Sequence, residues 1–216
     1  MIVDERMSSF INSYASQNSP MLDELEKFSI ETNVPIIRKE MQTLIKFLLA
    51  ANKPRSVLEV GTAIGFSAIL MAENLPSDSK ITTIEKYEKR IPVARENFEK
   101  FGVSDRITLL EGDATEILSK LSGQYDFIFM DAAKGQYINF FPDVCRLLKP
   151  GGILLTDNVM QEGDILESKF AVERRNRTIY KRMRDYLYEL THNEELTTVI
   201  LPVGDGVTIS TKRNDL

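Results

Sequence analysis

The chain has 216 residues, of which 43% are hydrophobic and 27% charged, so it can bury one sizeable core and is expected to form a single domain. One cysteine and one histidine exclude an internal disulfide and disfavour a cysteine- or histidine-rich metal site. The net charge of −5 does not by itself suggest nucleic-acid binding. No apolar run is long enough to span a membrane and no signal-peptide pattern is found, so a cytoplasmic protein is expected.

The first 52 residues are predicted to be a mainly helical extension that precedes the core. Apolar residues recur there at three- and four-residue spacing, which predicts helices over residues 4–16, 20–32 and 36–52. Beyond this extension, short apolar runs alternate with helical patterns, which is typical of βαβ units. The predicted strands of this part cover residues 56–61, 80–86, 106–113, 125–132 and 152–158. The predicted helices between them cover residues 66–75, 90–102, 114–121 and 137–152.

The C-terminal part is predicted to contain a long basic helix and a hairpin. The helix covers residues 167–191, and two strands over residues 197–203 and 206–212 flank a Gly-Asp-Gly turn. Alternating strands and helices favour a parallel sheet with helices on both faces, whereas the hairpin requires an antiparallel strand near one edge. We therefore expect an α/β, Rossmann-like, doubly wound fold with a seven-stranded, mainly parallel sheet. In this fold, residues 1–52 form the helical extension and residues 53–216 form the core.

Polar residues gather where the predicted parallel strands end. Ligands bind at the carboxyl ends of the strands in open α/β sheets, so the residues found there are candidates for a site. The second to fifth predicted strands all end on a carboxylate, namely Glu85, Asp113, Asp131 and Asp157. A helix cap explains any one of them, but their recurrence favours a shared binding site.

The loop after the first predicted strand, EVGTAIGFS over residues 59–67, is rich in glycine. Glycine lets the backbone approach a ligand closely. The spacing lacks the G-x-G-x-x-G fingerprint of dinucleotide-binding proteins, which disfavours a dehydrogenase. Glu85, at the end of the next strand, is able to accept hydrogen bonds from both hydroxyls of a ribose, so a nucleoside without a pyrophosphate is expected. The alternative is that Glu85 is an ordinary surface residue.

Asp131, Asp157 and Asn158 form a candidate metal site. They supply three oxygen ligands at the ends of two strands that we expect to be neighbours, and this set suits Mg²⁺ or Mn²⁺. Lys134 follows Asp131 closely and is the candidate catalytic base, because it is placed to take the proton of a substrate hydroxyl. The alternatives are that Asp157 and Asn158 only begin a loop and that Lys134 is an exposed lysine at the start of a helix.

Residues 174–184 carry six basic side chains and no acidic one. One interpretation is a solvated helix face, and the other is a surface that contacts phosphates. At helical spacing four of these residues share one face and the other two lie beside it. The shared face is formed by Arg174, Arg177, Lys181 and Arg184, with Arg175 and Arg182 beside it.

Five stretches of the chain, VLEVGTAIGFSAI, ITTIEK, EGDA, FIFMDAAKGQY and ILLTDNV, together resemble the class I methyltransferases that use S-adenosylmethionine. More narrowly, they are similar to the metal-dependent O-methyltransferases of the catechol and caffeoyl-CoA type. The resemblance implies that Asp131, Asp157 and Asn158 bind the metal and that Lys134 takes the proton. It also implies the contacts with S-adenosylmethionine. The methionine part would contact Glu59, Gly61, Ala63 and Ser67, the ribose Glu85, and the adenine Asp113 and Ala114. Further contacts are expected from Ile37, Gly112 and Asp131.

The whole chain most resembles the bacterial tRNA 5-hydroxyuridine methyltransferases, through the stretches VPII, VLEVGTAIGFSAI, DAAKGQYINFF, TDNV and LPVGDGVTIS. A segment rich in arginine and lysine, like residues 174–184, is also present in that family. This resemblance implies that the substrate is tRNA containing 5-hydroxyuridine, which is methylated to 5-methoxyuridine at the wobble position. It also implies that the basic segment contacts phosphates of the tRNA. It also implies a homodimer. One alternative is methylation of a small catechol or a caffeoyl-CoA-like ester. Another is a non-catalytic nucleotide- or RNA-binding module, which the presence of Asp131, Lys134, Asp157 and Asn158 disfavours.

Overall fold

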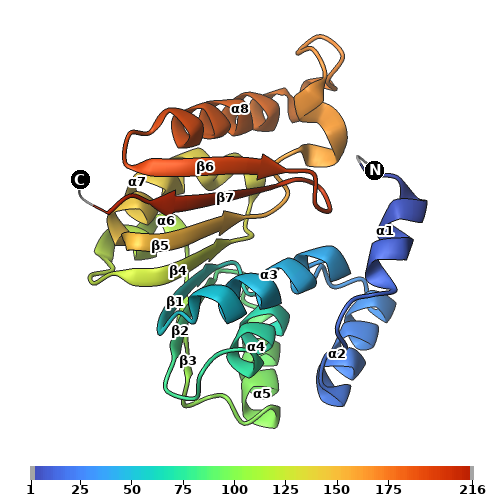
Figure 1. The fold of residues 1–216 in the computed structure, drawn as a ribbon, viewed down its shortest axis with the longest axis vertical. Helices are drawn as coiled ribbons and strands as arrows, with labels where there is room; N and C mark the ends of the chain where they lie inside the picture. The colour runs from blue at the N-terminus through green and yellow to red at the C-terminus, as the bar shows by residue number, and fades with distance from the viewer. Residues whose placement is uncertain (1–2, 215–216) are drawn as a thin grey trace.

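Seven strands form one sheet in the order β3-β2-β1-β4-β5-β7-β6 (Figure 1). The computed structural model describes residues 3–214. Neighbouring strands from β3 to β5 run parallel, and β7 runs antiparallel to both β5 and β6. The predicted fold, a mainly parallel sheet with an antiparallel C-terminal hairpin, is confirmed. The strands are β1 Ser56–Val60, β2 Lys80–Glu85, β3 Ile107–Glu111, β4 Tyr125–Met130, β5 Leu148–Thr156, β6 Leu196–Leu201 and β7 Val207–Lys212.

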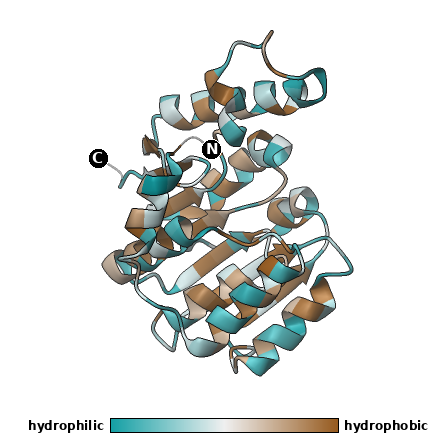
Figure 2. Ribbon diagram, turned by 90° about the vertical axis from the view of Figure 1, so that its right-hand side faces the viewer, coloured by the Kyte–Doolittle hydropathy of each residue, from teal (hydrophilic) through white to brown (hydrophobic). Residues whose placement is uncertain are grey.

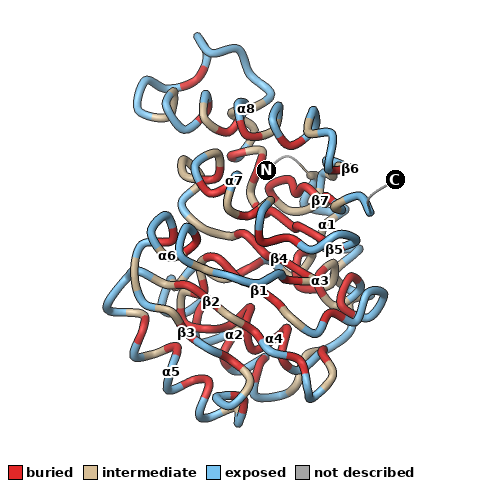
Figure 3. The backbone as a smooth tube through the Cα atoms, turned by 90° about the vertical axis from the view of Figure 1, so that its left-hand side faces the viewer, coloured by how far each residue is buried: buried red, intermediate tan, exposed pale blue. Residues whose placement is uncertain are grey.

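Helices cover both faces of the sheet, and each face has its own hydrophobic core (Figure 2). Phe127 and Phe129 of β4 belong to one core and Ile128 and Met130 to the other, because successive side chains of a strand point to opposite faces. Figure 3 shows buried residues concentrated in the central strands and on the helix sides that face them. The first core is covered by α2 Pro20–Glu31, α3 Lys39–Asn52, α4 Phe66–Glu73 and α5 Ile91–Lys100. The second is covered by α6 Ala114–Lys120, α7 Tyr137–Leu147 and α8 Arg177–His192.

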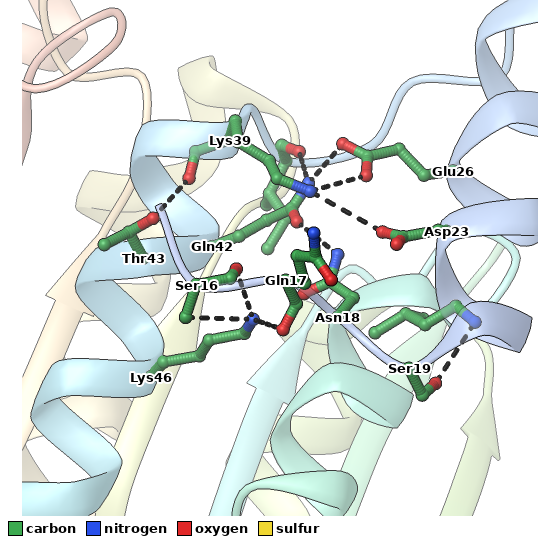
Figure 4. Close-up of polar contacts among 12 residues, drawn as sticks. Ser16, Gln17, Asn18, Ser19, Asp23, Glu26, Lys39, Gln42, Thr43 and Lys46 are labelled. Carbon is green, nitrogen blue, oxygen red and sulfur yellow. Dashed lines mark hydrogen bonds and ion pairs between the residues drawn. The ribbon is translucent and has the colours of Figure 1, made fainter. Parts of the chain in front are cut away.

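Polar contacts join the N-terminal segment to α3 (Figure 4). Lys39 Nζ lies 3.0 Å from Glu26 Oε2, and Lys46 Nζ donates to the carbonyl of Ser16 at 3.2 Å. The first helix, α1 Glu5–Asn12, has no buried residue. The homodimer, to which these N-terminal helices would contribute contacts, stays a prediction.

The C-terminal helix is shorter than predicted. It begins at Arg177 instead of residue 167, and Arg174–Asn176 form a separate 3-10 turn, η3. Val172 is the one buried residue among residues 167–173, so this stretch has no apolar stripe to hold a helix against the sheet. The prediction that Arg174 shares a helix face with Arg177 was therefore wrong.

Other predicted boundaries were also wrong, among them the start of α3, at Lys39 instead of residue 36, and the start of β5, at Leu148 instead of residue 152. The first helix ends at Asn12, and α7 ends at Leu147 because the backbone is already extended from Leu148 onward, as the start of β5. The remaining 3-10 segments are η1 Lys134–Gln136 and η2 Gln161–Leu166. Within residues 3–214, no helix combines the length and apolar character needed to cross a bilayer.

Candidate active site at the carboxyl ends of the strands

A cavity of about 410 Å³ lies at the carboxyl ends of β1 to β4, where the strand order reverses between β1 and β4. Ligands bind at this position in open α/β sheets because the connecting loops diverge there. All predicted cofactor residues except Glu59 line the cavity, together with the predicted base and one further metal ligand. The predicted residues in the lining are Ile37, Gly61, Ala63, Ser67, Glu85, Gly112, Asp113, Ala114, Asp131, Lys134 and Asn158.

The Glu85 carboxylate at the end of β2 is held by three backbone N–H groups. Its Oε2 accepts from Ala63 at 2.8 Å, and its Oε1 accepts from Lys86 at 2.9 Å and from Tyr87 at 2.8 Å. The carboxylate therefore joins the loop between β1 and α4 to the end of β2 and keeps one orientation at the cavity. Acceptor oxygens fixed in this way suit the binding of hydroxyl groups, as the predicted ribose contact requires.

Gly61 marks the point where the loop after β1 touches the backbone after β4. Its φ is +95°, and a Cβ there would overlap the carbonyl oxygen of Asp131. We expect Gly61→Ala to lower the free energy of unfolding by about 3 kcal/mol or more in urea denaturation, because backbone strain and overlap add. Gly123→Ala is the matched control, since Gly123 has the same φ but no atom within 4 Å of the added Cβ. Equal losses in the two variants would contradict the steric argument.

Glu59 lies beneath the cavity and not in its lining. Its side chain is fully buried and accepts hydrogen bonds from Ser67 Oγ and Thr83 Oγ1, both at 2.5 Å. Burial away from water raises the pKa of Glu59 to about 7, although the two hydroxyl donors oppose this shift. Glu59 thus orients Ser67, which does line the cavity, and its own contact with the methionine part stays a prediction.

The predicted metal ligands come together at the ends of β4 and β5. These strands are parallel neighbours in which Met130 pairs with Thr156, so Asp131 and Asp157 follow at equivalent positions. Asn158 Nδ2 lies 3.4 Å from Asp131 Oδ1, and the Asn158 N–H donates to Asp157 Oδ1 at 2.7 Å. The expected adjacency of the two strands is therefore confirmed.

The surroundings of the two carboxylates favour a cation. Burial raises the pKa of both Asp131 and Asp157, and the nearby charge of Asp131 raises that of Asp157 further. The ion pair of Lys134 is with Asp205, at 3.2 Å, and not with Asp131 or Asp157. Within residues 3–214 no three histidine, cysteine, aspartate or glutamate side chains are grouped to hold a metal. The candidate set is therefore two carboxylates and the Asn158 amide, which are oxygen donors of the kind that Mg²⁺ and Mn²⁺ prefer.

Two buried residues of the site were not predicted. Asp205 is 5% exposed and pairs with Lys134, although an aspartate between two turn glycines reads as exposed, so the local sequence carries no signal for it. The Tyr137 hydroxyl donates to the carbonyl of Asp157 at 3.2 Å and accepts from the Ala132 N–H at 3.3 Å. Tyr137 therefore braces the loops that carry the predicted metal ligands, and the local sequence carries no signal for these contacts.

The basic segment 174–184 borders the site beside Lys134. Arg175 lines a second cavity of about 420 Å³ that shares Lys134 with the first. Four of the six basic side chains have partners within the chain. Arg175 forms an ion pair with Glu173. The other three donate to backbone carbonyls, Arg177 to Val172, Arg182 to Gly135 and Arg184 to Ile165. Arg174 and Lys181 are exposed and take part in none of these contacts. Contact of the segment with phosphates stays a prediction.

Comparison with known proteins agrees with this geometry. The model of the O-methyltransferase family matches residues 12–213. Caffeoyl-CoA O-methyltransferase 1 of Eucalyptus globulus is 33% identical over 178 residues, which cover 76% of this chain and 70% of the relative. Catechol O-methyltransferase of Niastella koreensis is 33% identical over 127 residues, which cover 57% of this chain and 58% of the relative.

Solved structures show the same relationship across nearly the whole chain. A structure from Staphylococcus aureus is 34% identical with a TM-score of 0.88, and the match covers 97% of this chain and 100% of that one. The SAH-bound methyltransferase PaMTH1 of Podospora anserina is 27% identical with a TM-score of 0.87, covering 97% and 95%. The chain therefore belongs to the O-methyltransferase family.

Proposed function

We propose that the chain transfers the methyl group of S-adenosylmethionine to a hydroxyl that stands beside a second oxygen atom of the acceptor. One observation carries this proposal: a single cavity joins the predicted cosubstrate residues, except Glu59, to Lys134 and to two of the three predicted metal ligands, Asp131 and Asn158. The names of the relatives, caffeoyl-CoA and catechol O-methyltransferases, support it, because a catechol has two neighbouring oxygens.

The cavity fits a nucleoside with an attached amino-acid chain. Its volume of about 410 Å³ is in the range of small-molecule sites. The fixed Glu85 carboxylate is placed to accept from the ribose, and Asp113 lines the cavity while its side chain also caps α6 through the Thr115 N–H at 2.9 Å. The SAH-bound relative from Podospora anserina supports S-adenosylmethionine as the cosubstrate.

The residues of the site divide the work of methyl transfer. Held by Asp131, Asp157 and Asn158, Mg²⁺ or Mn²⁺ would supply positive charge that stabilises the deprotonated acceptor oxygen. Lys134 Nζ is the group placed to take the proton of the acceptor hydroxyl. The oxygen lone pair forms a bond to the methyl carbon while the S–CH₃ bond breaks and its electron pair stays on sulfur, which gives S-adenosylhomocysteine. The glycine loop and Glu85 hold the donor in line with the acceptor.

Two kinds of acceptor molecule are considered, and each carries a hydroxyl beside a second oxygen atom. The relatives favour a small catechol or a caffeoyl-CoA-like ester. The second cavity favours another acceptor, 5-hydroxyuridine in tRNA, whose 5-hydroxyl stands beside the 4-carbonyl. The lining of this cavity is mostly polar, which suits the hydroxyl groups of a ribose better than an apolar phenylpropenyl chain, whereas its three carboxylates disfavour a phosphate inside it. The polar residues of that lining are Lys134, Gln161, Glu162, Asp164, Glu173, Arg175 and Asn176.

Labelled S-adenosylmethionine, offered separately with catechol, caffeoyl-CoA and tRNA carrying 5-hydroxyuridine, tests the proposal. We expect label in at least one acceptor and loss of the label in EDTA, because the site needs a divalent cation. Label in tRNA alone, recovered as 5-methoxyuridine, would select the second acceptor. No transfer to any acceptor, or transfer that resists EDTA, would contradict the proposed chemistry.

A double variant tests the basic segment. Arg174→Glu with Lys181→Glu is expected to weaken methylation of tRNA by about tenfold or more at physiological salt, since each lost phosphate contact weakens binding. Turnover of catechol is expected to stay unchanged in the same variant. Lys27→Glu with Lys100→Glu, on α2 and α5, is the matched control for the change in net charge. Equal loss of tRNA methylation in both double variants would show that the segment has no specific role.

A further inference from the structure

Gln161 is a buried polar side chain on the loop that follows the predicted metal ligands. It is 7% exposed, and within residues 3–214 its Nε2 has no hydrogen-bond partner. Gln42, which is buried as well, shows the usual arrangement, because its Nε2 donates to Glu26 Oε1 at 2.8 Å and to the carbonyl of Ile37 at 3.2 Å. A buried amide without a partner destabilises the fold, so a ligand that supplies the missing partner would explain its presence.

Gln161 and Lys134 both line the second cavity, of about 420 Å³, and Gln161 is the buried residue of that lining. Lys134 also lines the first cavity. A molecule that places a hydroxyl at the lysine can therefore extend into the space that Gln161 bounds. The volume of this space is in the range of small-molecule sites, which includes a nucleoside.

The backbone at Gln161 is held in an uncommon conformation. Gln161 and Glu162 have φ angles of +50° and +56°, a region that residues other than glycine rarely adopt. The Glu162 N–H donates to Asp205 Oδ1 at 2.6 Å, and the Met160 N–H donates to the carbonyl of Asp205 at 2.9 Å. Strain that the surrounding structure fixes in this way is typical of ligand-binding loops, and it gives the Gln161 side chain a defined place in the cavity wall.

The amide of a glutamine recognises a hydrogen-bond donor that stands beside an acceptor. Its Oε1 accepts and its Nε2 donates, and a half-turn of the amide group exchanges the two atoms. A uracil ring offers the matching pair along one edge, where N3–H stands beside the 2-carbonyl. Catechol has no such edge, because its two oxygens are the hydroxyls that the cation and the base would engage.

We propose that Gln161 is a specificity-determining residue, which binds the N3–H and the 2-carbonyl of a 5-hydroxypyrimidine acceptor at the wall of the second cavity. This inference rests on the proposed function, because it takes the 5-hydroxyl and the 4-carbonyl as the oxygen pair at Lys134 and the candidate metal site. A ring whose 5-hydroxyl meets the lysine leaves its N3 edge for another residue of the cavity that Lys134 and Gln161 share.

Other side chains of this lining do not replace Gln161 in this role. Asp164 and Glu173 are carboxylates, which accept from N3–H but cannot donate to a carbonyl. Arg175 cannot accept, and its Nε lies 2.7 Å from Glu173 Oε2. Asn176 is also an amide, but its Nδ2 donates to Asp164 Oδ2 at 3.1 Å. Gln161 is therefore the buried amide of the lining whose donor is left for a ligand.

The experiment compares wild type with Gln161→Met on two tRNAs, assembled by ligation with either 5-hydroxyuridine or 3-methyl-5-hydroxyuridine at the wobble position, and on catechol. Methionine keeps the unbranched shape but has no amide. We expect wild type to prefer 5-hydroxyuridine by about tenfold or more in kcat/KM, because the methyl analogue leaves the amide unpaired. In Gln161→Met we expect kcat/KM for 5-hydroxyuridine to fall by a similar factor and the preference between the tRNAs to disappear. Catechol turnover is expected to stay unchanged.

A stability measurement separates recognition from a structural role. Gln161→Met is expected to keep or raise the free energy of unfolding in urea, because Nε2 has no partner to lose within residues 3–214. Gln42→Met is expected to lower it, since the bonds to Glu26 and Ile37 are lost. Gln124→Met is the kinetic control, because Gln124 is exposed and precedes the amino-terminal end of β4. This control is expected to keep the wild-type rates and preference.

Three results would overturn the role of Gln161: a wild type that methylates the two tRNAs equally, the same preference in wild type and Gln161→Met, or an equal loss in Gln124→Met. Label in catechol alone would also overturn it, while leaving the proposed methyl transfer in place. Failure of the proposed function is visible separately, as no transfer to any acceptor or as transfer that resists EDTA, and the role of Gln161 would then fall with it.

Discussion

Replacing Lys134 with methionine is expected to lower kcat for methyl transfer by about 10²- to 10⁴-fold, the range typical for loss of a general base. Methionine fills a similar space but offers no nitrogen to take the hydroxyl proton. The Lys134 side chain is 35% exposed and forms its ion pair with Asp205, so the fold is expected to tolerate the change. Single-turnover transfer from labelled S-adenosylmethionine measures the rate, and calorimetry is expected to show unchanged cosubstrate binding.

Lys149→Met is the matched control for this variant. Lys149 also pairs with an aspartate, Asp126 at 2.9 Å, but next to the amino-terminal end of β4. We expect the control to keep the wild-type kcat, because its ion pair lies far along the strands from the candidate site. Wild-type turnover in Lys134→Met would exclude Lys134 as the base and leave deprotonation of the acceptor to another group.

Asp157→Ala is expected to remove a ligand of the candidate metal site and to lower kcat by roughly 10²-fold or more. The loss follows because the remaining oxygen donors, from Asp131 and Asn158, are too few to hold a divalent cation tightly. Stability of the metal-free protein is expected to change little, since the lost carboxylate is buried and repelled by Asp131. Paramagnetic resonance of Mn²⁺ measures the binding, and urea denaturation measures the stability.

Asp143→Ala controls for removal of an aspartate outside the site. Asp143 pairs with Arg146 at 2.8 Å on α7, and this surface pair is expected to contribute little. The control should bind Mn²⁺ and turn over as the wild type does. Undiminished Mn²⁺ binding in Asp157→Ala, together with EDTA-sensitive turnover, would place the metal elsewhere.

The predicted sheet agrees with the structure because its signals are local. Runs such as Tyr125–Met130 alternate between two cores, so each strand is readable within a few residues. The helix predicted over residues 167–191 is wrong at its N-terminal end because that prediction, too, used only local signals. Its polar N-terminal part resembles an exposed helix, but packing against the sheet begins only at α8, with Tyr180 and Met183 as its first buried side chains.

The basic segment shows a limit of counting charges. Six basic residues in eleven suggested one phosphate-facing surface, yet Arg175, Arg177, Arg182 and Arg184 are bound to the chain itself. Charge density is visible in a sequence, whereas the partner of each charge depends on which loop folds over it. Arg174 and Lys181 are therefore the two residues on which the tRNA prediction now depends most.

The sequence by itself determined the alternating α/β architecture, the gathering of polar groups at the strand ends and the expectation that Asp131 and Asp157 follow neighbouring strands, because each rests on a short stretch of chain and on the geometry of parallel strands. Only the tertiary structure decided which carboxylates face the cavity and which lie beneath it, as Glu59 does. It also brought Asp205, 71 residues further along the chain, to Lys134. Contacts between distant segments depend on how the loops pack against one another, and no local pattern encodes that packing.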